Sequence, residues 1–182
     1  MAKSRVDVRA RQAPLKERYL AEPDAAVRTI RVWSGASDLS DPLHVEVVPL
    51  SAPATLLRSG AHPAVGGEGD VPCPADILLA ALAACQETTV RMVAANMGIE
   101  LRGLEVRAEA DWDPRGTLAM GREFPVGLSA VRVHTSVNIA GDARGERAER
   151  LLRSAERYCV VLDTLRRGVP VVATFSLAQE GG

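Results

Sequence analysis

Three cysteines, Cys73, Cys85 and Cys159, are the side chains of this sequence best suited to redox chemistry. They form no Cys-x-x-Cys pair and no cysteine and histidine cluster with zinc spacing, and three are too few for a disulfide scaffold. A pair of helix-borne cysteines can instead reduce a peroxide. One thiolate attacks the oxygen–oxygen bond and becomes a sulfenic acid, and the second condenses with it to form a disulfide.

The same residues also have a plain structural interpretation. Free cysteine is among the most buried residue types and packs as a small hydrophobic side chain, so composition alone favours Cys85 and Cys159 as inert core residues. Cys73 differs because it directly precedes a predicted helix, where free backbone N–H groups would face its sulfur. It lies about 18 Å from Cys85 along a continuous helix, so these two cysteines should not bridge.

Apolar spacing predicts the elements that carry the cysteines. Residues 74–97 predict a helix with a proline in its first turn and a glycine after its end. Its first half, residues 77–85, is apolar around the whole circumference, so this helix must be covered on every side. Residues 142–165 predict a second helix with Cys159 on its apolar face. Both cysteines are therefore expected in enclosed positions.

Predicted strands surround these helices. The spacing predicts strands over residues 26–33, 43–48, 101–112, 130–139 and 169–177, with a further candidate at 54–57. Because the strands come in groups rather than in regular alternation with helices, we expect an α+β sandwich. It would form one domain over residues 26–182, preceded by an N-terminal arm at residues 1–25. The all-apolar helix is easier to cover with a second subunit, so we also expect a homodimer.

Length and charge exclude several classes of protein. A chain of 182 residues is one ordinary domain. The 22 basic and 23 acidic side chains leave a net charge of -1, which gives no overall field for nucleic acid or an anionic membrane. The longest mostly apolar stretch, residues 77–85, is far shorter than the roughly 20 residues of a membrane span. Residues 1–11 are basic but lack the apolar segment of a secretory signal. We therefore expect a cytoplasmic protein that binds neither nucleic acid nor membrane.

The sequence around both helix-borne cysteines resembles that of the OsmC/Ohr family of thiol peroxidases. The resemblance rests on Gly66-Gly67-Glu68, on the run PADILLAALAAC that ends at Cys85, on Gly98-Ile99, on Leu104-Glu105-Val106, and on Glu156-Arg157-Tyr158-Cys159-Val160-Val161. It covers about residues 26 to 175. It points to the broader OsmC-like group rather than to the best-characterised organic hydroperoxide resistance branch.

The resemblance implies an α+β fold in which antiparallel-rich sheets wrap two central helices in an intertwined homodimer. It implies a thiol-dependent hydroperoxide reductase, an antioxidant enzyme of the stress response that uses no metal, flavin or other cofactor. Cys85 would be the peroxidatic nucleophile and Cys159 would resolve its sulfenic acid. A dithiol, either a small molecule or a lipoyl-type protein, would reopen the disulfide.

The sequence departs from the family pattern at two positions. Cys159 is followed by Val160, where the family usually has proline, and a supporting acidic residue near Cys85 is missing. In the best-characterised branch an arginine from the N-terminal strands holds the thiolate, and a glutamate ten residues before the first cysteine orients that arginine. The residue at this position is Ala75. Asp76 and Glu68 are the candidates to replace the glutamate, and Arg28 and Arg31 are the candidates for the arginine. Each also has a plainer role, Asp76 as a first-turn helix carboxylate and the arginines as solvated strand residues.

The departure at Ala75 keeps two other functions open. One is a non-enzymatic dimer on the same fold that binds a small hydrophobic ligand or senses redox state, with the cysteines as packing residues. The other is a structural dimer without a pocket. Trp33 and Trp112 could line an apolar pocket, although the scarcity of aromatic residues favours core positions for both. His62, in the glycine-rich loop before the first helix, could also reach a pocket, but the composition of this loop favours a surface position.

Overall fold

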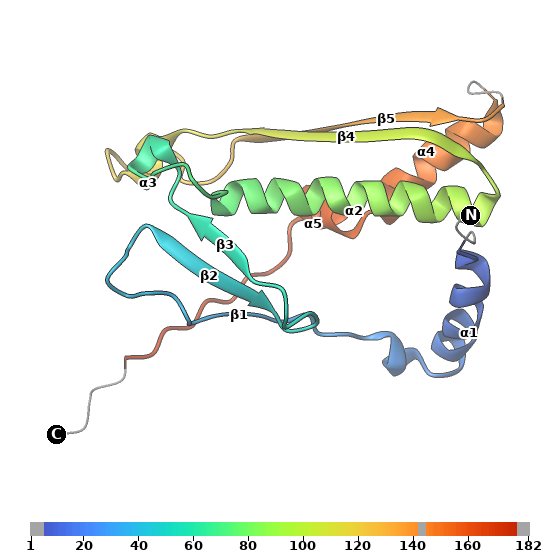
Figure 1. Cartoon of the computed structure of the whole chain (residues 1–182), viewed down its shortest axis with the longest axis horizontal. Helices are drawn as coiled ribbons and strands as arrows, with labels where there is room; N and C mark the ends of the chain where they lie inside the picture. Colours follow the sequence, from blue (N-terminus) through green and yellow to red (C-terminus); the bar gives the residue numbers. More distant parts are fainter. Residues whose placement is uncertain (1–5, 142–144, 178–182) are drawn as a thin grey trace.

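The computed structural model describes residues 6–141 and 145–177 (Figure 1). The helices are α1 (Val8–Ala21), α2 (Pro74–Met97), α3 (Pro114–Thr117), α4 (Glu146–Tyr158) and α5 (Val160–Arg167), with 3-10 turns η1 (Pro23–Ala26) and η2 (Pro63–Val65). The strands are β1 (Val32–Ser34), β2 (His44–Pro49), β3 (Leu57–Gly60), β4 (Leu101–Asp111) and β5 (Ala130–Ile139). Helices and antiparallel sheets in this order confirm the predicted α+β class.

Helix α2 is the centre of the molecule and has the predicted bounds. Cys73 caps its N-terminus, Pro74 occupies the first helical position, and Gly98 ends it with a left-handed φ of 64°. The helix packs against β4 on one side and against α4 and α5 on another (Figure 1). One side of the middle of α2 is therefore covered, with Leu82, Gln86 and Val90 buried.

Two antiparallel sheets form the β part. Strands β4 and β5 pair over their whole length, from Leu101 opposite Ile139 to Asp111 opposite Ala130. Their residues alternate between half-buried and exposed, so one face of this hairpin covers α2 and the other faces solvent. The second sheet has the order β1-β2-β3, and β3 leads through the glycine-rich loop into α2. That loop therefore joins the small sheet to the central helix.

The second predicted helix is interrupted. Helix α4 ends at Tyr158 and α5 begins at Val160, because Cys159 takes an extended conformation with φ −78° and ψ 104°. The break places the Cys159 sulfur at the start of α5 instead of in the middle of a continuous helix. The first residues of the predicted span, 142–144, lie outside the described residues.

The chain ends differ from the sequence prediction. In place of the predicted strand at 26–33, only the short strand β1 (Val32–Ser34) forms. The candidate strand at 54–57 lies three residues too early, because β3 spans Leu57–Gly60. The predicted strand at 169–177 is wrong for the single chain, because within the described part of the chain these residues form no regular secondary structure. Within the N-terminal arm, residues 8–21 form the helix α1, which reaches the end of α2, and residues 1–5 lie outside the described residues.

The core is small for a chain of this length. One buried cluster consists of Leu82, Cys159 and Leu162, and a second consists of Ala94, Ile99 and Leu151. By length and composition alone, helix α2 could span a membrane, but the central helices of soluble proteins meet the same criterion. Only 22% of the most apolar 18-residue window of α2 is buried. Much of its apolar surface therefore lacks cover within one chain.

Candidate functional site

The structure brings Cys85 and Cys159 together. Cys85 lies half-buried in the middle of α2, and Cys159 lies fully buried, with 0% exposure, between α4 and α5. Cys159 forms a cluster with Leu82 and Leu162, and Cys85 packs against that cluster. Both thiols are free. Two cysteines from separate helical regions thus share one apolar environment, as the dithiol hypothesis requires.

The environment of Cys159 keeps its sulfur protonated. Burial raises the pKa of the Cys159 thiol most, and the neighbouring Cys85 thiol raises it further as a hydrogen-bonding partner. The backbone N–H groups of Leu162 and Val161, at the start of α5, lower it in part. Because the net shift of the pKa is upward, Cys159 is a poor thiolate at neutral pH until its surroundings change.

Asp76 and the third cysteine form the N-terminal cap of α2. The Asp76 Oδ2 atom accepts a hydrogen bond of 2.9 Å from the Cys73 backbone N–H, and the Asp76 N–H donates to the Cys73 sulfur at 3.5 Å. This reciprocal arrangement is a capping box. The bond from the Cys73 N–H lowers the pKa of Asp76 below its ordinary value of 3.8. Both side chains are therefore engaged in starting the helix.

Replacing Asp76 with alanine is expected to destabilise the protein by about 1 kcal/mol at neutral pH, as for other N-terminal helix caps. Since its pKa is lowered in the folded state, the stability that Asp76 adds is present above pH 3.8 and is lost as the pH falls through the folded pKa. Urea unfolding of the parent and Asp76→Ala at several pH values measures the difference. A difference that is the same at low and at neutral pH would contradict the ionised cap.

The other supporting candidates lie away from the cysteine pair. Arg28 is exposed and donates to the Val27 carbonyl at 2.9 Å, and Arg31 is exposed ahead of β1. Glu68 lies in the loop before α2, beside His44 and Asp70. Asp76 is the cap described above. A role of any of these residues in holding the Cys85 thiolate stays a prediction.

Comparison with protein families identifies the family of this chain. A family model described as OsmC-like protein matches residues 67–174, which contain both Cys85 and Cys159 and more than half of the chain. The chain belongs to the OsmC-like family. A comparison of the sequence with curated proteins finds no significant match.

Solved structures support the same fold for this OsmC-like protein. An OsmC-like protein from Mycoplasma pneumoniae superposes with a TM-score of 0.59 at 16% identity, over 78% of this chain and 89% of that chain. An organic hydroperoxide resistance protein OsmC from Legionella pneumophila gives 0.57 at 23% identity, over 78% and 91%. An organic hydroperoxide resistance protein from Elizabethkingia anophelis gives 0.56 at 18% identity, over 79% and 91%. At these identities the likeness shows the fold.

A cavity of about 410 Å³ lies at the start of α2 in this OsmC-like protein. Its lining is mostly apolar and includes His62, Cys73, Leu79, Trp112 and Leu128. The His62 and Trp112 rings meet edge to face with centroids 5.5 Å apart. Two of the three residues suggested from the sequence, His62 and Trp112, therefore line a pocket, at the end of α2 that carries Cys73 rather than at Cys85. Trp33 does not line this pocket and is 51% exposed.

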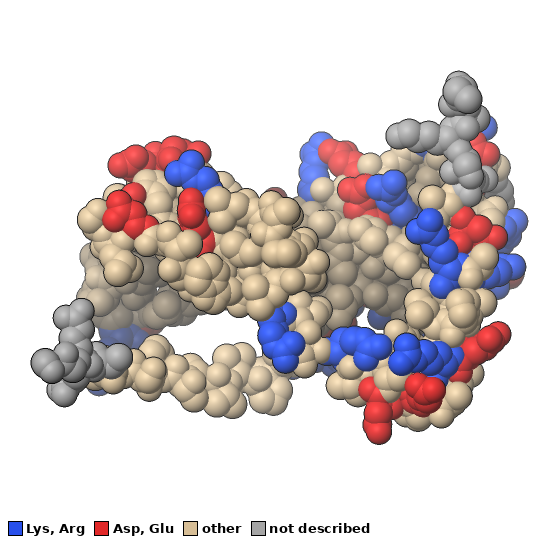
Figure 2. All heavy atoms as spheres, turned by 60° about the horizontal axis from the view of Figure 1, so that its bottom comes forward, with Lys and Arg blue, Asp and Glu red and all other residues tan. Residues whose placement is uncertain are grey.

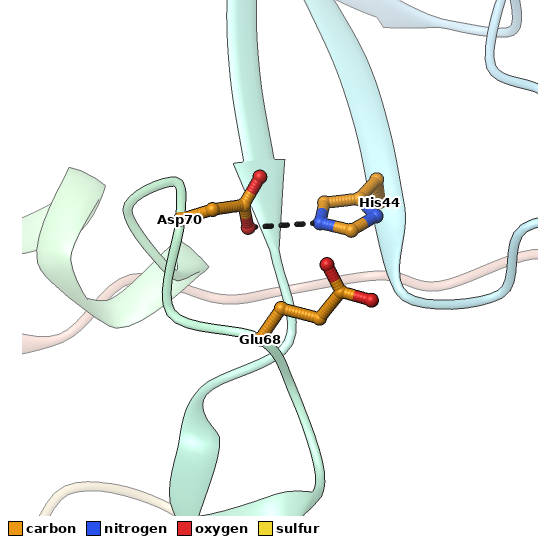
Figure 3. Close-up of side chains that lie close together, drawn as sticks. All are labelled: His44, Glu68 and Asp70. Carbon is orange, nitrogen blue, oxygen red and sulfur yellow. Dashed lines mark hydrogen bonds and ion pairs between the residues drawn. The ribbon is translucent and has the colours of Figure 1, made fainter.

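A cluster of polar side chains that the sequence did not reveal surrounds His44 at the start of β2 (Figure 3). Its Nδ1 lies 2.7 Å from Asp41 Oδ2 and its Nε2 lies 3.0 Å from Asp70 Oδ1, with Glu68 beside them. Hydrogen bonds to Asp70 and then Asp41 raise the pKa of His44. In the sequence, Asp41 lies close to His44 and Glu68 lies close to Asp70, but nothing there shows that the two segments meet. Only the folded chain brings them together.

Proposed function

We propose that this OsmC-like protein is a thiol-dependent peroxidase that reduces organic hydroperoxides. The observation that carries the proposal is the shared apolar environment of Cys85 and Cys159. Family membership agrees with it, and two structural neighbours are described as organic hydroperoxide resistance proteins. In this proposal Cys85 is the nucleophile and Cys159 the resolving residue.

The difference in burial supports this order of reaction. Cys85 is half-buried and Cys159 is fully buried, so a peroxide reaches Cys85 first. The Cys85 thiolate attacks the distal peroxide oxygen, the oxygen–oxygen bond breaks, and the alkoxide leaves and takes a proton to become the alcohol. Cys159 then attacks the Cys85 sulfenic sulfur, and the hydroxyl leaves with a proton as water. The products are an alcohol, water and a disulfide.

The surroundings of Cys85 favour an organic substrate over hydrogen peroxide. Cys85 packs with a cluster built from Leu82 and Leu162, to which Ala108, Val133 and Val161 also contribute apolar surface. Contact with this apolar surface stabilises the bound alkyl group of an organic hydroperoxide, whereas the second hydroxyl of hydrogen peroxide gains nothing from it. We propose that a dithiol, a small molecule or a lipoyl-type protein, reopens the disulfide by thiol–disulfide exchange. Such donors are kept reduced in the cytoplasm, which is the compartment we propose.

A single-turnover experiment tests the proposed reaction. The reduced protein is mixed with one equivalent of cumene hydroperoxide or of hydrogen peroxide, and thiols and intact mass are followed over time. We expect rapid loss of two thiols per chain, a disulfide between Cys85 and Cys159, and a faster reaction with the organic peroxide. Thiol oxidation no faster than that of free cysteine would overturn the proposal.

We also propose that the protein works as a homodimer. Residues 168–177 carry no charged side chain and leave the body of the molecule as an arm (Figure 2). In this arm Val172 is 87% and Phe175 is 96% exposed. Together with the uncovered apolar surface of α2, this is more apolar exposure than a monomer of this size normally keeps in water. A second copy of the chain would cover both surfaces and give the arm a strand partner.

Sedimentation equilibrium tests this association. We expect a mass of twice the 19.4 kDa of one chain at micromolar concentration. The double variant Val172→Asp, Phe175→Asp is expected to dissociate at least tenfold more readily, because it places charges on the apolar arm. Leu39→Asp, in an exposed loop, serves as the control and should associate like the parent. A monomeric parent, or a double variant that associates like the parent, would contradict the proposal.

The apolar cavity favours one alternative function. Its volume of about 410 Å³ and its mostly apolar lining suit a small hydrophobic ligand. In that case the protein would bind such a ligand at the start of α2, and the cysteine pair would be packing or a slow redox sensor. A Trp112-dependent fluorescence change with a hydrophobic probe, in a protein whose thiols react no faster than free cysteine, would favour this alternative.

A further inference from the structure

The cluster around His44 joins segments that are far apart in the sequence. His44 begins β2, whereas Glu68 and Asp70 come from the loop between β3 and α2 (Figure 3). One ligand atom from each of the three side chains lies within 4.8 Å of the other two. An imidazole nitrogen and two carboxylate oxygens thus converge on one point at the surface of the molecule.

The spacing of these atoms fits a metal ion. Ligand atoms bound at about 2.1 Å in adjacent positions of a metal's coordination shell lie about 3.0 to 3.4 Å apart. His44 Nε2 and Asp70 Oδ1 are 3.0 Å apart, so these two already have the separation of neighbouring ligands. A ligand atom of Glu68 lies within 4.8 Å of those two atoms, and its long, exposed side chain has rotational freedom to approach a bound ion.

Asp41 gives the histidine the orientation that a metal ligand needs. Without a metal, both ring nitrogens are hydrogen-bonded to carboxylates, Nδ1 to Asp41 and Nε2 to Asp70. A metal ion would displace the Nε2 proton, while Nδ1–H keeps donating to Asp41 Oδ2 at 2.7 Å and the Nε2 lone pair points toward Asp70 and Glu68. A carboxylate behind the far nitrogen of a ligating histidine is the usual outer shell of a protein metal site. Figure 3 shows the Nε2 side of the ring facing both loop carboxylates.

The charge of the cluster is not balanced by protein cations. Within residues 6–141 and 145–177, the ion pairs of Asp41 and Asp70 are both with His44, and Glu68 has none. Three carboxylates therefore surround one imidazole, an excess of negative charge that a divalent cation would neutralise.

The loop that supplies the two carboxylates is fixed by its glycines. A Cβ atom on Gly67 would lie 1.7 Å from the Ala61 carbonyl oxygen, so only glycine permits this close approach of the chain to itself. Gly69, between the two acidic residues, has a left-handed φ of 75°. The backbone therefore holds Glu68 and Asp70 beside β2 without help from their side chains.

We propose that His44, Glu68 and Asp70 bind a divalent first-row transition-metal cation, with Asp41 orienting the histidine. A nitrogen with two carboxylate oxygens is a ligand set that suits Zn²⁺ and its neighbours in the row, and water would complete the coordination shell. Bound there, the ion ties β2 to the loop before α2. The same loop provides Ala61, His62 and Val65 to the wall of the apolar cavity, so the ion fixes that wall.

Equilibrium dialysis of the reduced protein against Zn²⁺ at neutral pH tests the proposal. The parent is expected to bind one Zn²⁺ per chain more tightly than Asp70→Asn or Glu68→Gln, by roughly tenfold or more, because each variant removes one ligand. Asp41→Asn keeps all three ligands and is expected to lose roughly 10 to 100-fold in affinity through the histidine orientation. Circular dichroism confirms that these exposed substitutions leave the fold intact.

Two controls distinguish Zn²⁺ binding at His44, Glu68 and Asp70 from Zn²⁺ binding elsewhere, including by the cysteine thiols. Glu105→Gln removes an exposed carboxylate from β4 and should bind Zn²⁺ like the parent. In a Cys85→Ser, Cys159→Ser background, which abolishes zinc binding by the cysteine pair, the difference between parent and Asp70→Asn is expected to persist. The proposal is overturned if Asp70→Asn and Glu68→Gln bind Zn²⁺ as the parent does, or if the difference disappears with the cysteines. Neither result depends on whether the protein reduces peroxides.

Discussion

Replacing Cys85 with serine is expected to lower the rate of organic hydroperoxide reduction by about a thousandfold or more, because a serine hydroxyl cannot take the place of the thiolate nucleophile. In the proposed reaction Cys85 is the nucleophile because it is the more accessible of the two paired thiols. Of the two paired cysteines only Cys85 has exposed surface, since Cys159 is fully buried and burial raises its pKa. Stopped-flow measurement of thiol loss with cumene hydroperoxide gives the rate.

The variant Cys159→Ser separates the two chemical steps. It should still consume one equivalent of peroxide, but it should lose one thiol per chain instead of two and stop as the Cys85 sulfenic acid. A dimedone adduct on Cys85, detected by mass spectrometry, would identify that product. Turnover with a dithiol donor is then expected to be slow, because the disulfide that the donor reduces does not form.

Cys73→Ser is the matched control for both variants. Cys73 is buried like Cys159 but acts as the N-terminal cap of α2, a position where serine is one of the preferred residues. The variant should fold and reduce peroxide at the parent rate. If Cys73→Ser abolishes activity while Cys85→Ser retains it, the reacting thiol lies at the apolar cavity and the proposed assignment is wrong.

The elements with strong local signals were predictable from the sequence. Helix α2 has the predicted bounds because a capping residue, a first-turn proline and a terminal glycine each act within a few residues. Strands β4 and β5 follow from their period-two alternation in the same way, whereas their pairing with each other was not predicted. The break at Cys159 was not predictable, because apolar residues continue on both sides of it and only tertiary packing selects the extended conformation.

In the candidate site, too, the residue types were visible in the sequence, but the contacts between them were not. The sequence singled out Cys85 and Cys159 through the resemblance of both surrounding segments to the OsmC/Ohr family, whereas composition alone favoured inert packing. Their meeting depends on the packing of α2 against α4 and α5, which no local pattern contains. His44 was passed over because its partners become visible only after β2 pairs with β3 and the loop turns back. Burial and contact, rather than composition, decide which polar residues act together.

The largest expected loss of stability comes from Leu82→Ala. Leu82 has 0% exposure in the middle of α2 and forms the cluster with Cys159 and Leu162. Truncating a fully buried leucine removes its transfer free energy and leaves a cavity, so a loss of about 2 to 5 kcal/mol in the free energy of unfolding is expected. Urea unfolding at a fixed protein concentration measures it, since association contributes to the apparent stability.

Leu39→Ala is the matched control, because it makes the same truncation at a side chain that is 99% exposed and should change stability by less than about 0.5 kcal/mol. The cavity left by Leu82→Ala also adjoins both reacting sulfurs. Slower closure of the disulfide is therefore expected even where the variant is fully folded, while the first reaction with peroxide keeps its rate. A variant as stable as Leu39→Ala, with unchanged disulfide closure, would mean that the Leu82 cluster does not hold the two cysteines together.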